Sequence, residues 1–153
     1  MKQVEKISEG SNYTAINIGD LEDVKSYSLI HPISGKEVKG KVFVKEETNA
    51  TGAEISFTTL PSKSEWGYFH THRKNEETYI IIKGSGCYQV DDDCFPIQAG
   101  SIIRVGPKGV RSLCNTSEEE MMIICIQSKE NSLEEYTTDD GQRVAFLPKW
   151  KII

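Results

Sequence analysis

Two histidines separated by one residue are the first place in this chain where side chains could perform chemistry. His70 and His72 flank a threonine, and Glu76 and Glu77 follow within a few residues. At the period of a β-strand, such a pair projects from one face with its Cβ atoms about 7 Å apart. Two imidazoles and a carboxylate from a neighbouring strand can then meet around one cation at about 2.0–2.2 Å. These donors suit Fe(II), Mn, Zn, Ni or Cu rather than a thiophilic ion.

Aromatic side chains precede the two histidines. Trp66 and Tyr68 share the strand parity of His70 and His72, so we expect all four to line the same concavity. An aromatic wall beside polar ligands is typical of a pocket for a small molecule. The competing interpretation is a half-exposed strand whose His and Glu side chains are simply solvated.

The elements that must position these residues show an alternation of period two. Short segments rich in β-branched and aromatic residues recur at spacings of about 8–12 residues, with Gly, Pro, Asp or Asn between them. The predicted strands cover residues 42–44, 53–60, 76–83, 87–90, 94–97, 101–105, 110–115 and 121–127. This pattern predicts an all-β sandwich or barrel. A tight hairpin turn is expected at Asp91–Asp92, and residues 20–24 could start a short helix with Asp20 as N-cap.

Two of the predicted strands are apolar on both faces. Ile80–Ile82 and Met121–Ile126 must therefore be covered on both sides, by the opposite sheet and by another segment or subunit. The chain also ends on an apolar segment, Leu147–Ile153. Because two-fold dimers are the commonest closed oligomers, we expect a homodimer.

The length of 153 residues favours a single domain over residues 1–153. We expect a barrel core at about 40–128, an N-terminal extension at 1–39 and a C-terminal tail at 129–153. Hydrophobic residues make up 37% of the chain and charged residues 27%, which is an ordinary soluble globular composition.

The charge balance argues against several partners. Lys plus Arg number 18 against 23 Asp plus Glu, a formal net charge of −5. Sequence-independent nucleic-acid binding needs clustered Lys and Arg, so no nucleic-acid partner is expected. The longest apolar stretch, Met121–Ile126, is too short to span a bilayer. The opening MKQVEKISEG lacks the apolar core of a signal peptide, so we expect a cytoplasmic protein without a membrane partner.

The four cysteines are Cys87, Cys94, Cys114 and Cys125, and none of them forms a Cys-x-x-Cys pair. We expect small buried thiols in a reducing compartment rather than disulfides or a zinc site.

Residues 66–115 resemble the two sequence motifs of the cupin superfamily. The first motif, G-x5-H-x-H-x(3,4)-E-x6-G, is matched by His70, His72, Glu77 and Gly84. The resemblance implies that these two histidines and Glu77 are metal ligands. It also implies a double-stranded β-helix, or jelly roll, that places the two motifs on facing strands of one barrel.

The second cupin motif, G-x5-P-x-G-x2-H-x3-N, matches less well. Its ends fall on Gly100 and Asn115, but the position of the third histidine ligand holds Arg111. Small single-domain bacterial cupins look most similar. Cupins include dioxygenases, isomerases, decarboxylases, storage proteins and sugar-binding regulatory domains, so the fold does not name the function.

Arg111 leaves three interpretations open. His70, His72 and Glu77 could bind a divalent metal (Fe, Mn, Zn or Ni) and leave open positions. Arg111 could instead pair with Glu77 in a metal-free pocket. It could also receive an anionic substrate beside the metal. A +1 charge about 5 Å from a divalent ion costs about 6–7 kcal/mol at an effective dielectric of 20, so an inward Arg111 predicts weak metal binding.

Two functions follow from these interpretations. The first is a metal-dependent oxygenase or isomerase that acts on a small anionic or sugar-like molecule, with Tyr68, Tyr79 or Arg111 as candidate catalytic groups. Trp66, Tyr68 and Arg111 would then contact the substrate. The second is a metal-free binding or sensor protein without turnover, which the absent third histidine favours.

Overall fold

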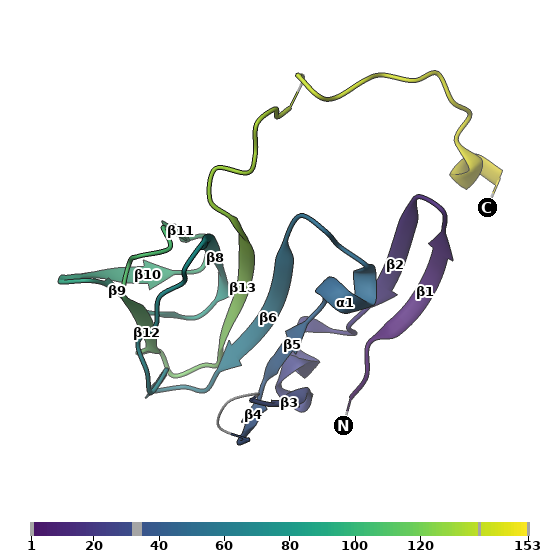
Figure 1. The fold of residues 1–153 in the computed structure, drawn as a ribbon. Helices are drawn as coiled ribbons and strands as arrows, with labels where there is room; N and C mark the ends of the chain where they lie inside the picture. The colour runs from purple at the N-terminus through teal and green to yellow at the C-terminus, as the bar shows by residue number, and fades with distance from the viewer. Residues whose placement is uncertain (1, 32–34, 138, 153) are drawn as a thin grey trace.

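The computed structural model describes residues 2–31, 35–137 and 139–152 (Figure 1). Strands account for 48% of the chain and helices for 8%. The all-β prediction is therefore confirmed. No helix in these described ranges is long and apolar enough to cross a membrane.

Two facing antiparallel sheets form the barrel. The first has the strand order β10-β9-β12-β7, and the second has the order β11-β8-β13-β6-β5. The strands of the first sheet are β7 (Ser64–Glu65), β9 (Ser85–Val90), β10 (Asp93–Gln98) and β12 (Arg111–Asn115). Those of the second are β5 (Lys41–Phe43), β6 (Glu54–Leu60), β8 (Asn75–Lys83), β11 (Ile102–Val105) and β13 (Met121–Lys129). Every strand expected from the alternation is present, within a few residues at its ends.

The order of the strands is that of a jelly roll. β8 lies between β11 and β13, and β12 lies between β9 and β7, so neighbours in the sheets are distant in sequence. The predicted hairpin turn is present and joins β9 to β10. Asp93 pairs with Val90 across it, and Asp91 has a φ of 52°. Asp tolerates this left-handed conformation better than most residues other than Gly.

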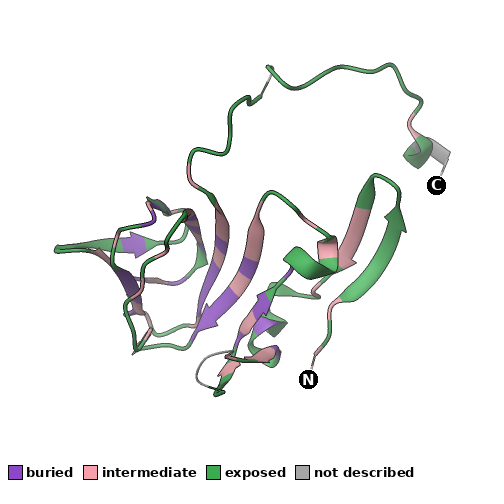
Figure 2. Cartoon of the chain, in the orientation of Figure 1, coloured by how far each residue is buried: buried purple, intermediate pink, exposed green. Residues whose placement is uncertain are grey.

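The main core fills the space between the two sheets, where the buried strand positions lie (Figure 2). It contains inward side chains from both sheets, such as Tyr79 and Ile81 of β8, Tyr88 of β9, Leu113 of β12 and Ile123 of β13. All of these are at most 3% exposed. Burial of this apolar surface is the principal stabilising term of the barrel.

The N-terminal extension covers the outer face of the second sheet. It consists of β1 (Glu5–Gly10), β2 (Tyr13–Asn17), η1 (Leu21–Ser26), β3 (Ser28–Ile30) and β4 (Glu37–Lys39), and a short helix, α1 (Lys45–Thr48), follows β5. Val24 and Tyr27 of this extension form a second core with Val42 and Met122. The doubly apolar strand β13 is therefore covered on its outer face by the chain's own extension. Asp20 occupies the N-cap position of η1 but makes no capping hydrogen bond through its side chain.

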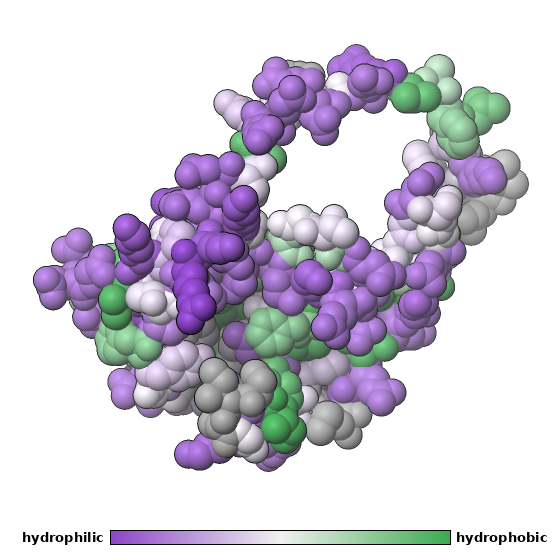
Figure 3. All heavy atoms as spheres, viewed as in Figure 1, coloured by the Kyte–Doolittle hydropathy of each residue, from purple (hydrophilic) through white to green (hydrophobic). Residues whose placement is uncertain are grey.

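The C-terminal tail leaves β13 and arcs away from both sheets before the short helix η2 (Lys149–Ile152) (Figure 1). Its apolar side chains lie in solvent, with Phe146 85% and Leu147 86% exposed. The space-filling view shows a mostly hydrophilic arch with a group of hydrophobic side chains on the part that descends from its top (Figure 3).

Candidate functional site

The site is built on the irregular segment between β7 and β8. The backbone N–H of His70 donates to the carbonyl of Arg111 at 3.2 Å, and the N–H of Arg111 donates back at 3.1 Å. The N–H of His72 donates to the carbonyl of Pro107 at 2.8 Å. The sequence predicted strand geometry for the two histidines, but they do not lie on a regular strand. An isolated bridge to β12 and a bond to the preceding turn fix this segment instead.

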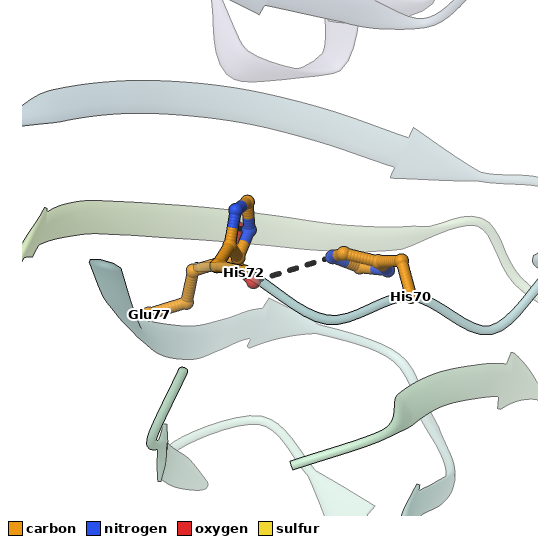
Figure 4. Close-up of side chains that lie close together, drawn as sticks. All are labelled: His70, His72 and Glu77. Atoms are coloured by element: carbon orange, nitrogen blue, oxygen red, sulfur yellow. Dashed lines mark ion pairs between the residues drawn. The ribbon is translucent and has the colours of Figure 1, made fainter. Parts of the chain in front are cut away.

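The side chains of His70, His72 and Glu77 converge (Figure 4). His70 Nε2 lies 3.4 Å from Glu77 Oε2, and His72 Nε2 lies 3.1 Å from Glu77 Oε1. One ligand atom from each of the three residues lies within 4.8 Å of the others. Glu77 is buried, whereas both histidines are about a quarter exposed and form the mouth of the site. The group could hold a metal ion, and its role as a ligand set stays a prediction.

Arg111 faces the same carboxylate from the opposite sheet. Its side chain is 0% exposed, and its Nε and Nη2 donate to Glu77 Oε2 at 3.1 and 2.7 Å. Its Nη1 donates to the carbonyls of Pro107 and Gly109 at 3.3 and 2.8 Å. The guanidinium therefore occupies the place where the cupin motif has a third histidine. Because it is buried and extensively bonded, it is poorly placed to receive a substrate.

Further donors surround Glu77. The Tyr79 hydroxyl donates to Oε2 at 2.5 Å, and Gln127 Nε2 donates to Oε1 at 3.3 Å. Burial alone would raise the pKa of Glu77, but hydrogen bonds from His70, Tyr79 and Arg111 outweigh it and hold this pKa well below its usual range. Burial also raises the pKa of Tyr79 far above its usual value, so its hydroxyl stays protonated as a donor.

Lys41 is a functional candidate that the sequence did not reveal. It lines a cavity of about 150 Å³ together with His70, His72, Glu77 and Gln127. Its Nζ lies 4.9 Å from the centre of the Phe43 ring and forms no hydrogen bond or ion pair with the residues that the structure describes. Burial lowers the pKa of Lys41, and the nearby Cys125, Glu77 and Glu54 oppose this shift. Val42 packs in the second core, so the adjacent Lys41 points to the opposite face of β5.

The aromatic residues line a neighbouring cavity. Trp66 and Tyr68 stack with ring centroids 6.3 Å apart, and the Tyr68 ring lies 5.7 Å from that of His70. Both line a second cavity of about 240 Å³. The Trp66 ring lies 6.4 Å from that of His70, and Lys41 Nζ lies 5.6 Å from the centre of the Trp66 ring. The roles of Trp66, Tyr68 and Tyr79 toward a substrate stay predictions.

The three-residue group fits a metal ion by spacing but not by charge. Two ligands at about 2.1 Å and at right angles lie about 3.0 Å apart, close to the 3.1 Å between His72 and Glu77. The negative charge of Glu77, however, is already neutralised by Arg111 at 2.7 Å. His70 Nδ1 is also buried without a hydrogen-bond partner among the described residues. Metal-bound histidines almost always donate from their second ring nitrogen. The spacing therefore allows the group to hold a metal ion, whereas the charge of Arg111 opposes tight binding of a divalent ion.

Comparison with known proteins identifies relatives of the same fold. Residues 56–127 match the family described as Cupin domain. The chain is 35% identical to a cupin protein from Bacteroides fragilis, with a TM-score of 0.66 over 69% of this chain and 89% of that one. It resembles a protein with a double-stranded β-helix domain from Klebsiella pneumoniae, which is 16% identical, with a TM-score of 0.56 over 74% of this chain and 90% of that one.

A curated relative extends the likeness in sequence. The uncharacterized protein MJ1618 of Methanocaldococcus jannaschii is 30% identical over 56 residues, which are 37% of this chain and 45% of the relative. The chain therefore matches less than half the length of this relative.

Proposed function

This chain belongs to the cupin family, and from that premise we propose that its barrel cavity binds a small anion without a metal ion. The observation that carries the proposal is the buried pair of Arg111 and Glu77, with N–O distances of 2.7 and 3.1 Å. The guanidinium neutralises the charge of the carboxylate and occupies its hydrogen-bonding positions, so this carboxylate is less available as a metal ligand. This supports the metal-free alternative over the metalloenzyme.

Lys41 is the cationic side chain of this cavity that could bind an anion. Lys41 supplies an ammonium group that has no acceptor among the described residues, and His70 and His72 stand at the mouth. A ring N–H of histidine can donate a hydrogen bond to an anion. The carboxylate of Glu54 at the wall accepts the backbone N–H of Lys45 at 2.9 Å. Drug-sized ligands occupy pockets of about 300–1,000 Å³, so a cavity of about 150 Å³ restricts the ligand to a small molecule.

Titration with small anions tests this proposal. Calorimetry with acetate, oxalate, malonate and phosphate should detect binding of at least one of them to the wild-type protein. Lys41→Met should weaken that binding by about tenfold or more, equal to about 1.4 kcal/mol. Lys39→Met is the matched control, because that side chain is 76% exposed two residues away. Equal affinity in wild type and Lys41→Met would contradict the proposal, as would no binding at millimolar concentration.

A metal-dependent function is the second candidate, because the spacing of His70, His72 and Glu77 favours it. Arg111→His would remove a positive charge and restore the three-histidine set of the family. It should raise the affinity for Mn(II) by about tenfold or more. Mn(II) is the suitable probe because it prefers oxygen and nitrogen donors over thiolates. Tight Mn(II) binding by the wild-type protein would contradict the metal-free proposal.

We further propose that the protein forms a homodimer through its C-terminal tail. Phe146 and Leu147 are exposed on the tail. Ile102 of β11 is 68% exposed and pairs with Ile80 on a face of the second sheet that the second core does not include. Ile153, part of the predicted apolar end, lies outside the described residues. Light scattering at tens of micromolar should give a dimer, and a chain ending after residue 130 should be monomeric. A monomeric full chain would contradict this assembly.

A further inference from the structure

Three of the four cysteines lie together on the outer face of the first sheet. β9 runs between β10 and β12, and Cys87 of β9 is the direct cross-strand partner of Cys114 of β12. On the other side, Cys87 pairs with Pro96, two residues from Cys94. Cross-strand partners share a face, and residues two apart share a face, so all three thiols point the same way. The expectation of buried thiols holds for Cys125 but is wrong for these three, which are half-buried or exposed.

The three thiols are neighbours on this face, with Cys87 in the centre. Directly opposed residues of antiparallel strands have Cβ atoms about 4.5–5.5 Å apart, and diagonal neighbours are about 7–8 Å apart. Cys87 is directly opposite Cys114 and diagonal to Cys94. Cys114 and Cys94 lie on opposite sides of Cys87, so the arrangement offers pairs of sulfur ligands rather than a cluster of three or four.

The cavity beside these thiols is suited to a cation. Cys87, Cys94 and Cys114 line the cavity of about 240 Å³ together with Glu65, the direct partner of Cys114 in β7. Among the lining residues that the structure describes there is no Lys, Arg or His. Tyr68 and Phe69 also line this cavity, and each is more than half exposed. The surroundings are therefore neutral to acidic and rich in sulfur.

The same surroundings argue against a reactive thiol. Burial and the neighbouring thiols of Cys114 and Cys94 raise the pKa of Cys87 above its usual value. A nucleophilic or peroxide-sensing cysteine needs a lowered pKa and a nearby positive charge. When a cation displaces the protons of two adjacent thiols, its positive charge offsets the repulsion between the two thiolates that form.

We propose that Cys87, together with Cys114 or Cys94, binds a soft, thiophilic cation of the Cu(I) class. Soft thiolates select Cu(I), which is satisfied by two or three sulfur ligands. Structural Zn(II) requires four ligands in a tetrahedron, which three thiols in a row do not provide. Binding releases one proton from each thiol that becomes a ligand and changes no oxidation state. This site is separate from the cavity of Lys41 and does not depend on the proposed function.

Titration of the reduced full-length protein with Cu(I) under anaerobic conditions tests the proposal. Competition with a chromogenic Cu(I) chelator measures affinity, and the ultraviolet thiolate-to-copper band reports the ligand. Loss of an outer partner of a metal ligand typically costs about 10–100-fold in affinity, and Cys87→Ser should cost at least that much and remove the band. Cys114→Ser and Cys94→Ser should each lower the Cu(I) affinity less, because Cys87 keeps one neighbouring thiol.

Gln89→Ala is the matched control, because Gln89 lies two residues from Cys87 and lines the same cavity without a thiol. It should bind Cu(I) as the wild type does. Circular dichroism of each variant should show that the fold is intact. Equal Cu(I) affinity in wild type and Cys87→Ser would overturn the proposal. So would Zn(II) binding tighter than Cu(I), or a Cys87–Cys114 disulfide in protein that binds no Cu(I) after reduction.

Discussion

Two adjacent glutamates of β8 have arginine partners in opposite environments. Glu77 points into the barrel and pairs with Arg111 of β12, whose side chain is 0% exposed. Glu76 points outward and pairs with Arg104 of β11, whose side chain is 52% exposed. The residue types are the same and the glutamates are neighbours in sequence. The difference teaches that strand parity decides whether such a pair is buried in the candidate site or exposed on the surface.

The two pairs differ in what else surrounds them. Arg104 Nε donates to Glu76 at 2.8 Å, and Nη2 donates to Glu130 at 3.0 Å. Because this side chain is exposed, water can replace either partner. In the barrel, Tyr79 and two carbonyls complete the hydrogen bonds of Glu77 and Arg111. Buried charges depend on such complete pairing because water cannot replace a lost partner.

The largest expected effect comes from removing the buried cation. Arg111→Met leaves Glu77 buried without its partner and should lower the free energy of unfolding by about 3–5 kcal/mol. Urea denaturation at pH 7 measures this loss. The double variant Arg111→Met/Glu77→Leu should recover part of it, because no unpaired charge remains. A single-variant loss below about 1 kcal/mol would show that the pair is not buried as described.

The sequence predicted the strands well because their period of two depends on burial of one face by the other sheet. It missed β3, β4 and β7, because strands of two or three residues, such as Ser28–Ile30, have too little alternation to recognise. It missed β1 and β2 of the extension as well, and every residue of β1 is exposed. It also left open what covers β13, since Met122 needs a partner that only the folded extension supplies. These elements depend on contacts distant in sequence rather than on a local pattern.

The candidate site was predictable in part. The spacing of His70, His72 and Glu77, and the position of Arg111, followed from the cupin motifs. Nothing in the sequence showed that Lys41 would share their cavity, because β5 and β8 are brought together only through β6 and β13. The outward cluster around Cys87 depends on register: a one-residue slip of β9 against β12 would separate it from Cys114.

A smaller effect is expected from removing the buried negative charge. Glu77→Gln keeps an acceptor for Arg111 and Tyr79 but loses the charge of the hydrogen bonds. It should lower the free energy of unfolding by about 1.5–3 kcal/mol, the range for hydrogen bonds to charged groups. Urea denaturation beside Glu76→Gln, the exposed neighbour, gives the matched comparison. Equal losses in the two variants would break the distinction between the inner and outer pairs.

The smallest effect is expected at the outer pair. Arg104→Met removes an arginine whose partners, Glu76 and Glu130, remain accessible to water. Exposed ion pairs contribute little because solvent screens them and the side chains lose entropy on pairing. Denaturation should give nearly the midpoint of the wild type, and any difference should vanish in about 1 M salt, where the screening length is about 3 Å. The loss in Arg111→Met should persist at the same salt concentration, because the barrel excludes the screening ions. A salt-sensitive loss at Arg111, or a salt-resistant loss at Arg104, would reverse the assignment of the two environments.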